Sequence, residues 1–193
     1  GIIAVVGCDG SGKSTLTADL LARLREDQLT ELIYLGQSSG DIAEWIRRLP
    51  VIGPAVERYL RRKGDTAHAA GDEPPSPDVP TALVVHLLSR WRHYKFRRML
   101  ALNRRGTVVV TDRYPQAEVP GFYFDGPGLD PAGTTRALVR WIAARELRLY
   151  RQMASHVPAL VIRLNIDAEA AYARKPDHKL SMLRDKVRVI PTL

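Results

Sequence analysis

The residues best suited to chemistry form one run near the start of the chain, Gly7-Cys8-Asp9-Gly10-Ser11-Gly12-Lys13-Ser14. The run fits the pattern G-x-x-x-x-G-K-[S/T], in which backbone N–H groups converge on phosphate oxygens. Its glycines let the backbone approach the phosphates and adopt dihedral angles that a side chain would forbid. A strand-like stretch, residues 2–6, precedes the run and an amphipathic helical stretch follows it, which is the required context. The pattern predicts a loop that binds the phosphates of a nucleoside triphosphate.

This phosphate-binding loop supplies most of the candidate site residues. We expect the nucleotide to be bound by Asp9, Gly10, Ser11, Gly12, Lys13, Ser14 and Thr15. Lys13 is also a catalytic candidate, because its ammonium group can reach the outer phosphates. The hydroxyl group of Ser14 can bind the Mg²⁺ ion that accompanies ATP, so the expected cofactors are ATP and Mg²⁺.

Asp112 and Arg113 follow a β-branched stretch, residues 107–111, which predicts a buried strand. A carboxylate at the end of such a strand can hold Mg²⁺ together with Ser14, whereas its structural role would be to cap the turn. Arg113 suits a second anionic substrate at the same sheet edge and is a catalytic candidate. A hydrolytic motor would carry a second acid there to activate water, and the guanine-reading pattern Asn-Lys-x-Asp is absent.

Short motifs follow one another along the chain: Asp9 inside the loop, Ser89-Arg90 with His93, Asp112-Arg113-Tyr114, Gly128-Leu129-Asp130, and the run from Leu164 to Arg174. In order and approximate spacing they resemble the thymidylate kinases, over residues 2–174. The resemblance implies an ATP-dependent phosphotransferase that transfers the γ-phosphoryl group to a small phosphorylated acceptor, a nucleoside monophosphate. An acceptor phosphate is already an anion and needs no general base. That agrees with the lack of a convincing Asp-His pair in the sequence.

The resemblance also implies roles for single residues. Asp9 would contact the 3′-hydroxyl of the acceptor's sugar, Arg90 would face the acceptor's base and phosphate, and Arg113 would grip its phosphate. Arg174 would act in catalysis from a lid, near residues 174–180, that closes over the ATP phosphates. Independently of the resemblance, the basic pair Arg174-Lys175 also predicts such a lid, although a solvated helix end would explain the basic pair equally well.

The chain departs from the family pattern on the acceptor side. Gly36-Gln37-Ser38-Ser39 replaces an Arg-Glu-Pro-Gly segment, His86 replaces the aromatic residue that stacks on thymine, and Phe124-Asp125 replaces a Tyr-Gln pair. Two alternative functions therefore stay open. One is a kinase of a hydroxyl metabolite such as a sugar, with Asp9 or Asp112 as the base. The other is a regulatory ATP-binding module that contacts nucleic acid.

Composition narrows the class of protein. The length of 193 residues predicts one domain, residues 1–193, and the net charge of +8 suits phosphate substrates or nucleic acid. No apolar run reaches the roughly 18 residues of a membrane span, so we expect no membrane partner.

The single cysteine, Cys8, excludes an internal disulfide and favours the cytoplasm. We expect its thiol beside the phosphates, where the helix N-terminus would lower its pKa. A homodimer is among the oligomeric states left open.

Alternating strands and helices predict an α/β protein with the three-layer P-loop NTPase fold, a parallel sheet flanked by helices. The expected strands are residues 2–6, 32–35, 107–111 and 159–164. The expected helices are residues 13–25, 83–102, 132–156 and 167–174, with a helical tail from residue 180.

Two further segments and two helix faces complete the expectations. Residues 41–63 look helical with breaks, and their basic part, residues 45–63, is expected to be a solvated face or part of a lid. Residues 64–80, rich in glycine and proline, predict a mobile loop. The inward-facing residues are expected to be Leu83, Leu87, Trp91, Met99 and Leu102 on one long helix, and Leu138, Ile142, Leu149 and Met153 on the other.

Overall fold

The computed structural model describes residues 1–36, 76–176 and 179–192. The expectations for residues 41–63 and for most of the 64–80 loop lie outside these residues. The chain divides into two compact units. The first comprises Gly1–Gly36, Tyr94–Tyr114 and His156–Leu193, and the second comprises Gln37–His93 and Pro115–Ser155. The two units are described separately.

The first unit contains a sheet of four parallel strands in the order β2-β3-β1-β4. The strands are β1 (Ile2–Gly7), β2 (Thr30–Tyr34), β3 (Val108–Asp112) and β4 (Leu160–Leu164). The registers Val5↔Asp112 and Gly7↔Leu164 bring the ends of β3 and β4 level with the end of β1. Because parallel strands end at one edge, the residues that follow β1 and β3 emerge close together. All four predicted strands are confirmed.

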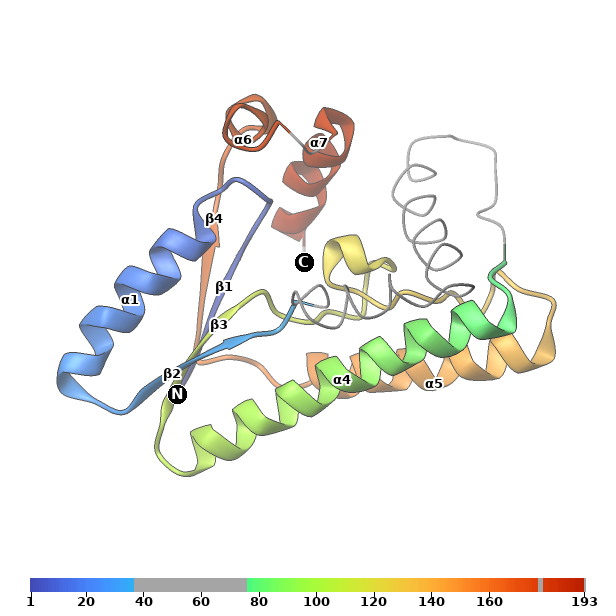
Figure 1. Cartoon of the computed structure of the whole chain (residues 1–193), viewed down its shortest axis with the longest axis horizontal. Coiled ribbons are helices and arrows are strands. Elements are labelled where there is room, and N and C mark those ends of the chain that lie inside the picture. The colour runs from blue at the N-terminus through green and yellow to red at the C-terminus, as the bar shows by residue number, and fades with distance from the viewer. Residues whose placement is uncertain (37–75, 177–178, 193) are drawn as a thin grey trace. The chain divides into compact units, whose positions relative to one another are not determined.

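Helices cover this sheet (Figure 1). The helix α1 (Lys13–Asp27) packs against β1, β2 and β3. The helices α6 (Ala168–Arg174) and α7 (Leu180–Val189) pack against each other, and a short 3₁₀ turn, η3 (Ile190–Thr192), follows them. The long helix α4 (Val79–Arg104) belongs to the first unit from Tyr94 onward. The first unit therefore has the predicted three-layer α/β architecture.

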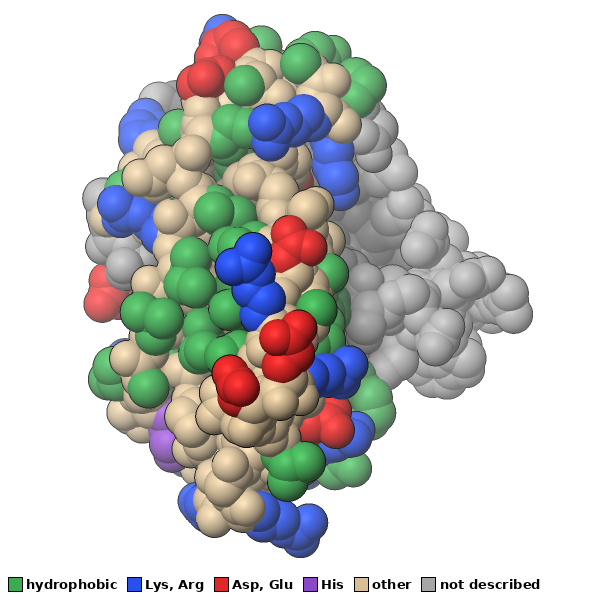
Figure 2. Space-filling view, turned by 90° about the vertical axis from the view of Figure 1, so that its left-hand side faces the viewer, with side chains coloured by type: hydrophobic (Ala, Val, Ile, Leu, Met, Phe, Trp, Pro, Cys, Tyr) green, Lys and Arg blue, Asp and Glu red, His purple; other side chains and the backbone are tan. Residues whose placement is uncertain are grey.

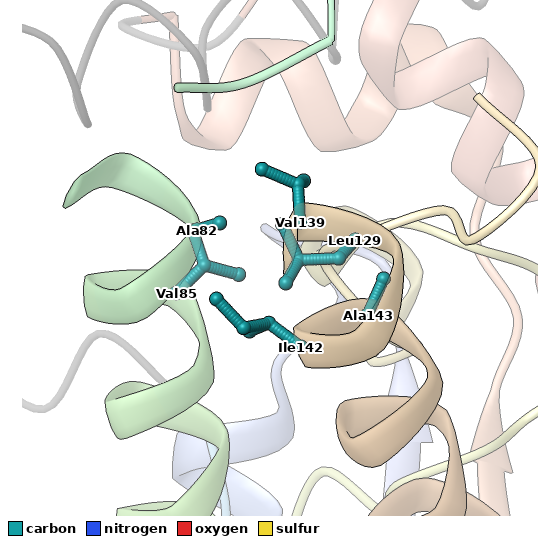
Figure 3. Close-up of a cluster of buried hydrophobic side chains, with 6 residues drawn as sticks. All are labelled: Ala82, Val85, Leu129, Val139, Ile142 and Ala143. Carbon is teal, nitrogen blue, oxygen red and sulfur yellow. The ribbon is translucent and has the colours of Figure 1, made fainter. Parts of the chain in front are cut away.

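The second unit is built around the first part of α4 and the helix α5 (Ala137–Ala154), with a 3₁₀ turn, η2 (Phe122–Phe124). Figure 3 shows its hydrophobic core, in which side chains of both helices meet one residue of the intervening loop: Ala82, Val85, Leu129, Val139, Ile142 and Ala143. None of the helices in the described parts of the chain is both long and apolar enough to cross a membrane.

The buried faces of α4 and α5 differ from the predicted ones. Four residues expected to face inward are exposed: Leu83, Leu87, Trp91 and Leu138. Polar residues take the inside instead, because they find partners there. Ser89 donates a hydrogen bond to Glu146 (2.5 Å), and Arg92 forms an ion pair with Asp125 (2.9 Å). A buried face that includes satisfied polar groups does not follow an apolar stripe, so the periodicity of large hydrophobic residues was misleading.

Candidate functional site

The loop between β1 and α1 has the backbone geometry of an anion site. Gly12 caps α1 in the left-handed conformation (φ 91°), where no capping side chain accepts a hydrogen bond from the backbone and the first turn has no acidic residue. Gly10 is also left-handed (φ 83°), and a Cβ atom there would lie 2.6 Å from the carbonyl oxygen of Ala171. The N–H groups that begin α1 are thus open to a ligand rather than to a cap, as phosphate binding requires.

Lys13 lies over this loop. Its Nζ atom donates hydrogen bonds to the carbonyl oxygens of Gly7 (3.0 Å) and Cys8 (2.6 Å), and the residue is buried. Burial and the positive charge of Arg113 lower the pKa of Lys13. The negative charges of Asp9 and then Asp112 act in the opposite direction. Asp112 ends β3 in register with Val5 of β1, close to Gly7, whose carbonyl oxygen accepts from Lys13. The lysine of the loop and the acidic residue that ends β3 therefore lie at the same edge of the sheet.

Asp9 is held by two cations, one of which the sequence did not reveal. Its Oδ1 atom accepts from Arg113 (2.7 Å) and its Oδ2 atom accepts from Lys186 on α7 (2.5 Å). Burial alone would raise the pKa of Asp9, but the charges of Lys186 and Arg113 outweigh it and hold that pKa well below its usual range. Lys186 stands between Leu183 and Ile190 on the apolar stripe of α7, and a charge in such a stripe was the signal available in the sequence.

Arg113 has an unusual backbone. Its φ angle is 70°, and among the described non-glycine residues only Asp125, at 62°, also has a positive φ. Its N–H donates to the carbonyl oxygen of Val5 (3.0 Å), and its own carbonyl oxygen accepts from Thr111 Oγ1 (2.6 Å). Such a conformation costs free energy and persists where neighbouring contacts fix it. Here they fix a guanidinium group beside the phosphate-binding loop.

Of the remaining predicted residues, Ser11, Ser14, Thr15 and Arg174 lie in the first unit and Arg90 lies in the second. Ser14 and Thr15 are exposed at the start of α1, and Arg174, which ends α6, donates a long hydrogen bond to the carbonyl oxygen of Gly10 (3.4 Å). The buried Oγ atom of Ser11 has no hydrogen-bond partner among the described residues. Arg90 is exposed on α4 in the second unit, so its acceptor role stays a prediction.

In the second unit, the motif residues join a buried polar network. Glu146, fully buried, accepts from the backbone N–H groups of Gly128 (3.0 Å) and Leu129 (2.7 Å) as well as from Ser89. Arg92 lies over the ring of Tyr150, with 5.7 Å between the guanidinium carbon and the ring centroid. Sequence reasoning missed this network, because charged residues within helices ordinarily indicate a solvated face.

Two of the remaining predictions concern single side chains, His86 and Cys8. His86 is half-buried. Burial is the main cause that lowers its pKa, and the positive charges of Arg90 and Arg145 lower it further. The predicted direction of the pKa shift of Cys8 is wrong. Its thiol is buried against α6 and α7, beside Ala171, and burial raises its pKa despite the nearby helix N-terminus. Desolvation of the thiolate outweighs the charge of Lys13, which acts in the opposite direction.

The chain is similar over its whole length to proteins of Escherichia coli K12. It is 54% identical over 192 residues to the uncharacterized ATP-binding protein YghS, and the match covers 100% of this chain and 80% of YghS. It is 45% identical over 190 residues to the uncharacterized ATP-binding protein YghR, covering 98% of this chain and 75% of YghR. No protein-family model matches the chain.

Similar solved structures include a thymidylate kinase from Ehrlichia chaffeensis, with 17% identity, a TM-score of 0.48 and coverage of 99% of this chain and 86% of the kinase. A deoxyadenosine kinase from M. mycoides with bound dATP has 14% identity, a TM-score of 0.49 and coverage of 99% and 83%. The family, however, is shown by the sequence relatives. With about half of its residues identical to theirs over nearly its whole length, the chain belongs to the same protein family as YghS and YghR of Escherichia coli.

Proposed function

We propose that this chain is an ATP-dependent phosphotransferase that moves the γ-phosphoryl group of ATP to a small phosphorylated acceptor, a nucleoside monophosphate in the first place. The observation that carries the proposal is the gathering of three cations, Lys13, Arg113 and Lys186, around Asp9 at the start of α1. Phosphoryl transfer depends mainly on positioning and on neutralising negative charge, which such a cluster provides. The names of YghS and YghR as ATP-binding proteins support ATP as the donor.

The donor side would use the loop backbone, Lys13 and a metal ion. Ser14 and Asp112 offer the hydroxyl and carboxylate oxygens that Mg²⁺ prefers. Within the described residues no group of three or more His, Cys, Asp or Glu side chains could hold a metal on its own. The fitting ion is thus one that arrives with ATP and keeps water and phosphate oxygens among its ligands. Bound there, Mg²⁺ would neutralise charge between the outer phosphates.

The acceptor side favours a substrate that is already ionised. A hydroxyl acceptor needs a general base, and a base works best with a pKa near the operating pH. Asp9 is unsuited to that task, because Lys186 and Arg113 hold its pKa well below its usual range despite burial. A phosphate acceptor has its own anionic oxygen, which the guanidinium group of Arg113 would bind. The charges at Asp9 therefore favour a phosphorylated acceptor over a sugar kinase with Asp9 as its base, and a sugar kinase would have to use Asp112 instead.

The alternative of a nucleic-acid-binding module would call for a continuous basic surface. On the face of the molecule shown in Figure 2, lysine and arginine side chains lie among acidic and hydrophobic ones. At the site, Lys13, Arg113 and Lys186 lie close to Asp9, and this small excess of positive charge suits a phosphate ligand. We assign the chain to small-molecule phosphoryl transfer.

The test is a screen of nucleoside monophosphates and sugars for ATP-dependent product formation, followed by ³¹P NMR. The variant Lys13→Ala should lose transfer and keep its fold. The matched control is Arg23→Ala, which removes an exposed charge from the same helix and should behave like the wild type. If only sugars are phosphorylated, the acceptor is a hydroxyl metabolite and not a nucleoside monophosphate. ATP binding without any product, or full turnover in folded Lys13→Ala, would refute the phosphotransferase.

A further inference from the structure

Lys186 occupies a position where a charge is costly. The face of α7 that carries it packs beside the loop through Leu183, next to the partly buried Leu180 and Val187. The side chain of Lys186 is 4% exposed. Burial of an ammonium group is unfavourable unless it is paired, and a hydrophobic residue of similar length would avoid that penalty. Packing alone therefore does not explain a lysine there.

One partner of Lys186 is a residue of the phosphate-binding loop itself. Asp9 divides its two oxygens between Lys186 and Arg113, and its side chain is 12% exposed. Lys13 is a third cation within reach, because it is hydrogen-bonded to the carbonyl oxygen of Cys8, next to Asp9 in the chain. Without Lys186, the carboxylate could turn towards Lys13 and neutralise the charge that the phosphates need.

We propose that Lys186 is a positioning residue for nucleotide binding, which holds one oxygen of Asp9 so that the other orients Arg113 and the carboxylate stays away from Lys13. The inference rests on the proposed function, because it assumes that Lys13 and Arg113 act on phosphates. The ion pair also ties α7 to the loop across 177 residues of sequence. The C-terminal helix thereby sets the geometry of a loop near the N-terminus.

The test is a double-mutant cycle with Lys186→Met and Asp9→Asn in the full chain. Two quantities are measured: the Kd for Mg²⁺ with a non-hydrolysable ATP analogue, by calorimetry, and kcat/KM for the acceptor. Lys186→Met should weaken analogue binding or transfer by about 10- to 100-fold, the range expected for loss of one charged hydrogen bond. In the Asp9→Asn background the same substitution should change either quantity by less than about threefold, because Lys186 acts through Asp9.

The matched control is Arg184→Met, which removes an exposed charge from the same helix, where Arg184 pairs with Glu169. It should leave both quantities at the wild-type value. If Lys186 has a purely structural role, Lys186→Met should have a lower Tm but an unchanged Kd and kcat/KM in the folded protein. That result would overturn the proposal. If Lys186→Met does not fold, the double variant is compared with Asp9→Asn alone, and unequal Kd values would overturn it.

The two proposals fail in different ways. If the wild type transfers phosphate but the effects of Lys186→Met and Asp9→Asn multiply independently, the role of Lys186 is wrong and the phosphotransferase stands. If no acceptor is phosphorylated but analogue binding shows the coupling, Lys186 positions the loop and the proposed reaction is wrong. An Lys186→Met protein that matches Arg184→Met in both measurements removes the inference alone.

Discussion

Two substitutions at Arg113 can separate the free-energy cost of its left-handed backbone from the stabilisation that its side chain provides. Arg113→Ala and Arg113→Gly both remove the guanidinium group and with it the hydrogen bond to Asp9. Alanine keeps the unfavourable φ of 70°, whereas glycine adopts that value without a steric penalty. The two variants therefore differ only in the Cβ methyl group and in the backbone strain that this group causes.

The expected magnitudes follow from these contacts. Both side chains of the Arg113–Asp9 pair are mostly buried, at 18% and 12% exposed, so its loss should destabilise each variant by about 1.5–3 kcal/mol. Relief of the left-handed conformation returns about 1–2 kcal/mol to the glycine variant. The greater freedom of glycine in the unfolded chain removes about 0.4–1 kcal/mol of that. Arg113→Gly should therefore be more stable than Arg113→Ala by about 0.8 kcal/mol from the middle of both ranges, and by about 1.6 kcal/mol at most.

The assay is urea unfolding of both variants at neutral pH, with acceptor kinetics on the same samples. The control pair is Arg98→Ala and Arg98→Gly on the exposed side of α4, where the order should reverse and glycine should be less stable by about 1 kcal/mol. Both Arg113 variants should lose acceptor kcat/KM alike, by about 10- to 100-fold. An alanine variant as stable as the glycine variant would refute the argument from backbone strain.

Three further results are expected. Glu146→Gln should destabilise the protein by about 2–4 kcal/mol in urea unfolding, because an amide cannot accept all the donors that meet the buried carboxylate, whereas the exposed Glu26→Gln should have little effect. A bulky maleimide should modify Cys8 far more slowly in the native than in the urea-unfolded protein, and equal rates would contradict its burial. Because the folded-state pKa of Asp9 is lowered, the unfolded chain takes up the proton first as pH falls. The wild type should thus lose stability relative to Asp9→Asn below about pH 4, with a constant difference from about pH 5 to 8.

Local patterns predicted the elements of the fold well. The β-branched run before Asp112 and the glycine motif each determine structure over a few residues, and the strands and helices lie within a few residues of the predicted ones. The rule that parallel strands end at one edge then placed Arg113 beside the loop, and the structure shows it bonded to Asp9.

Contacts between residues distant in sequence could not be predicted in the same way. Lys186 and Glu146 are buried charges, and composition alone assigns such residues to a solvated surface. Their burial depends on partners on other elements, which periodicity within one helix does not reveal. The same limitation of periodicity explains why Leu87 was expected inside. The pKa of Cys8 was predicted to shift in the wrong direction because the burial of its thiol depends on residues of α6 and α7, far away in the sequence.

The sheet order has a consequence for synthesis of the chain. The strand β1 is made first but pairs with β3 and β4, which are made much later, and the loop that follows β1 gains Lys186 later still. A nascent chain therefore carries an unpaired hydrophobic strand until residue 112 and beyond has left the ribosome. Pairings over such long sequence separations also slow folding. We expect nucleotide binding to be acquired only when α7 has emerged, so truncated nascent chains should be candidates for chaperone binding rather than early ligand capture.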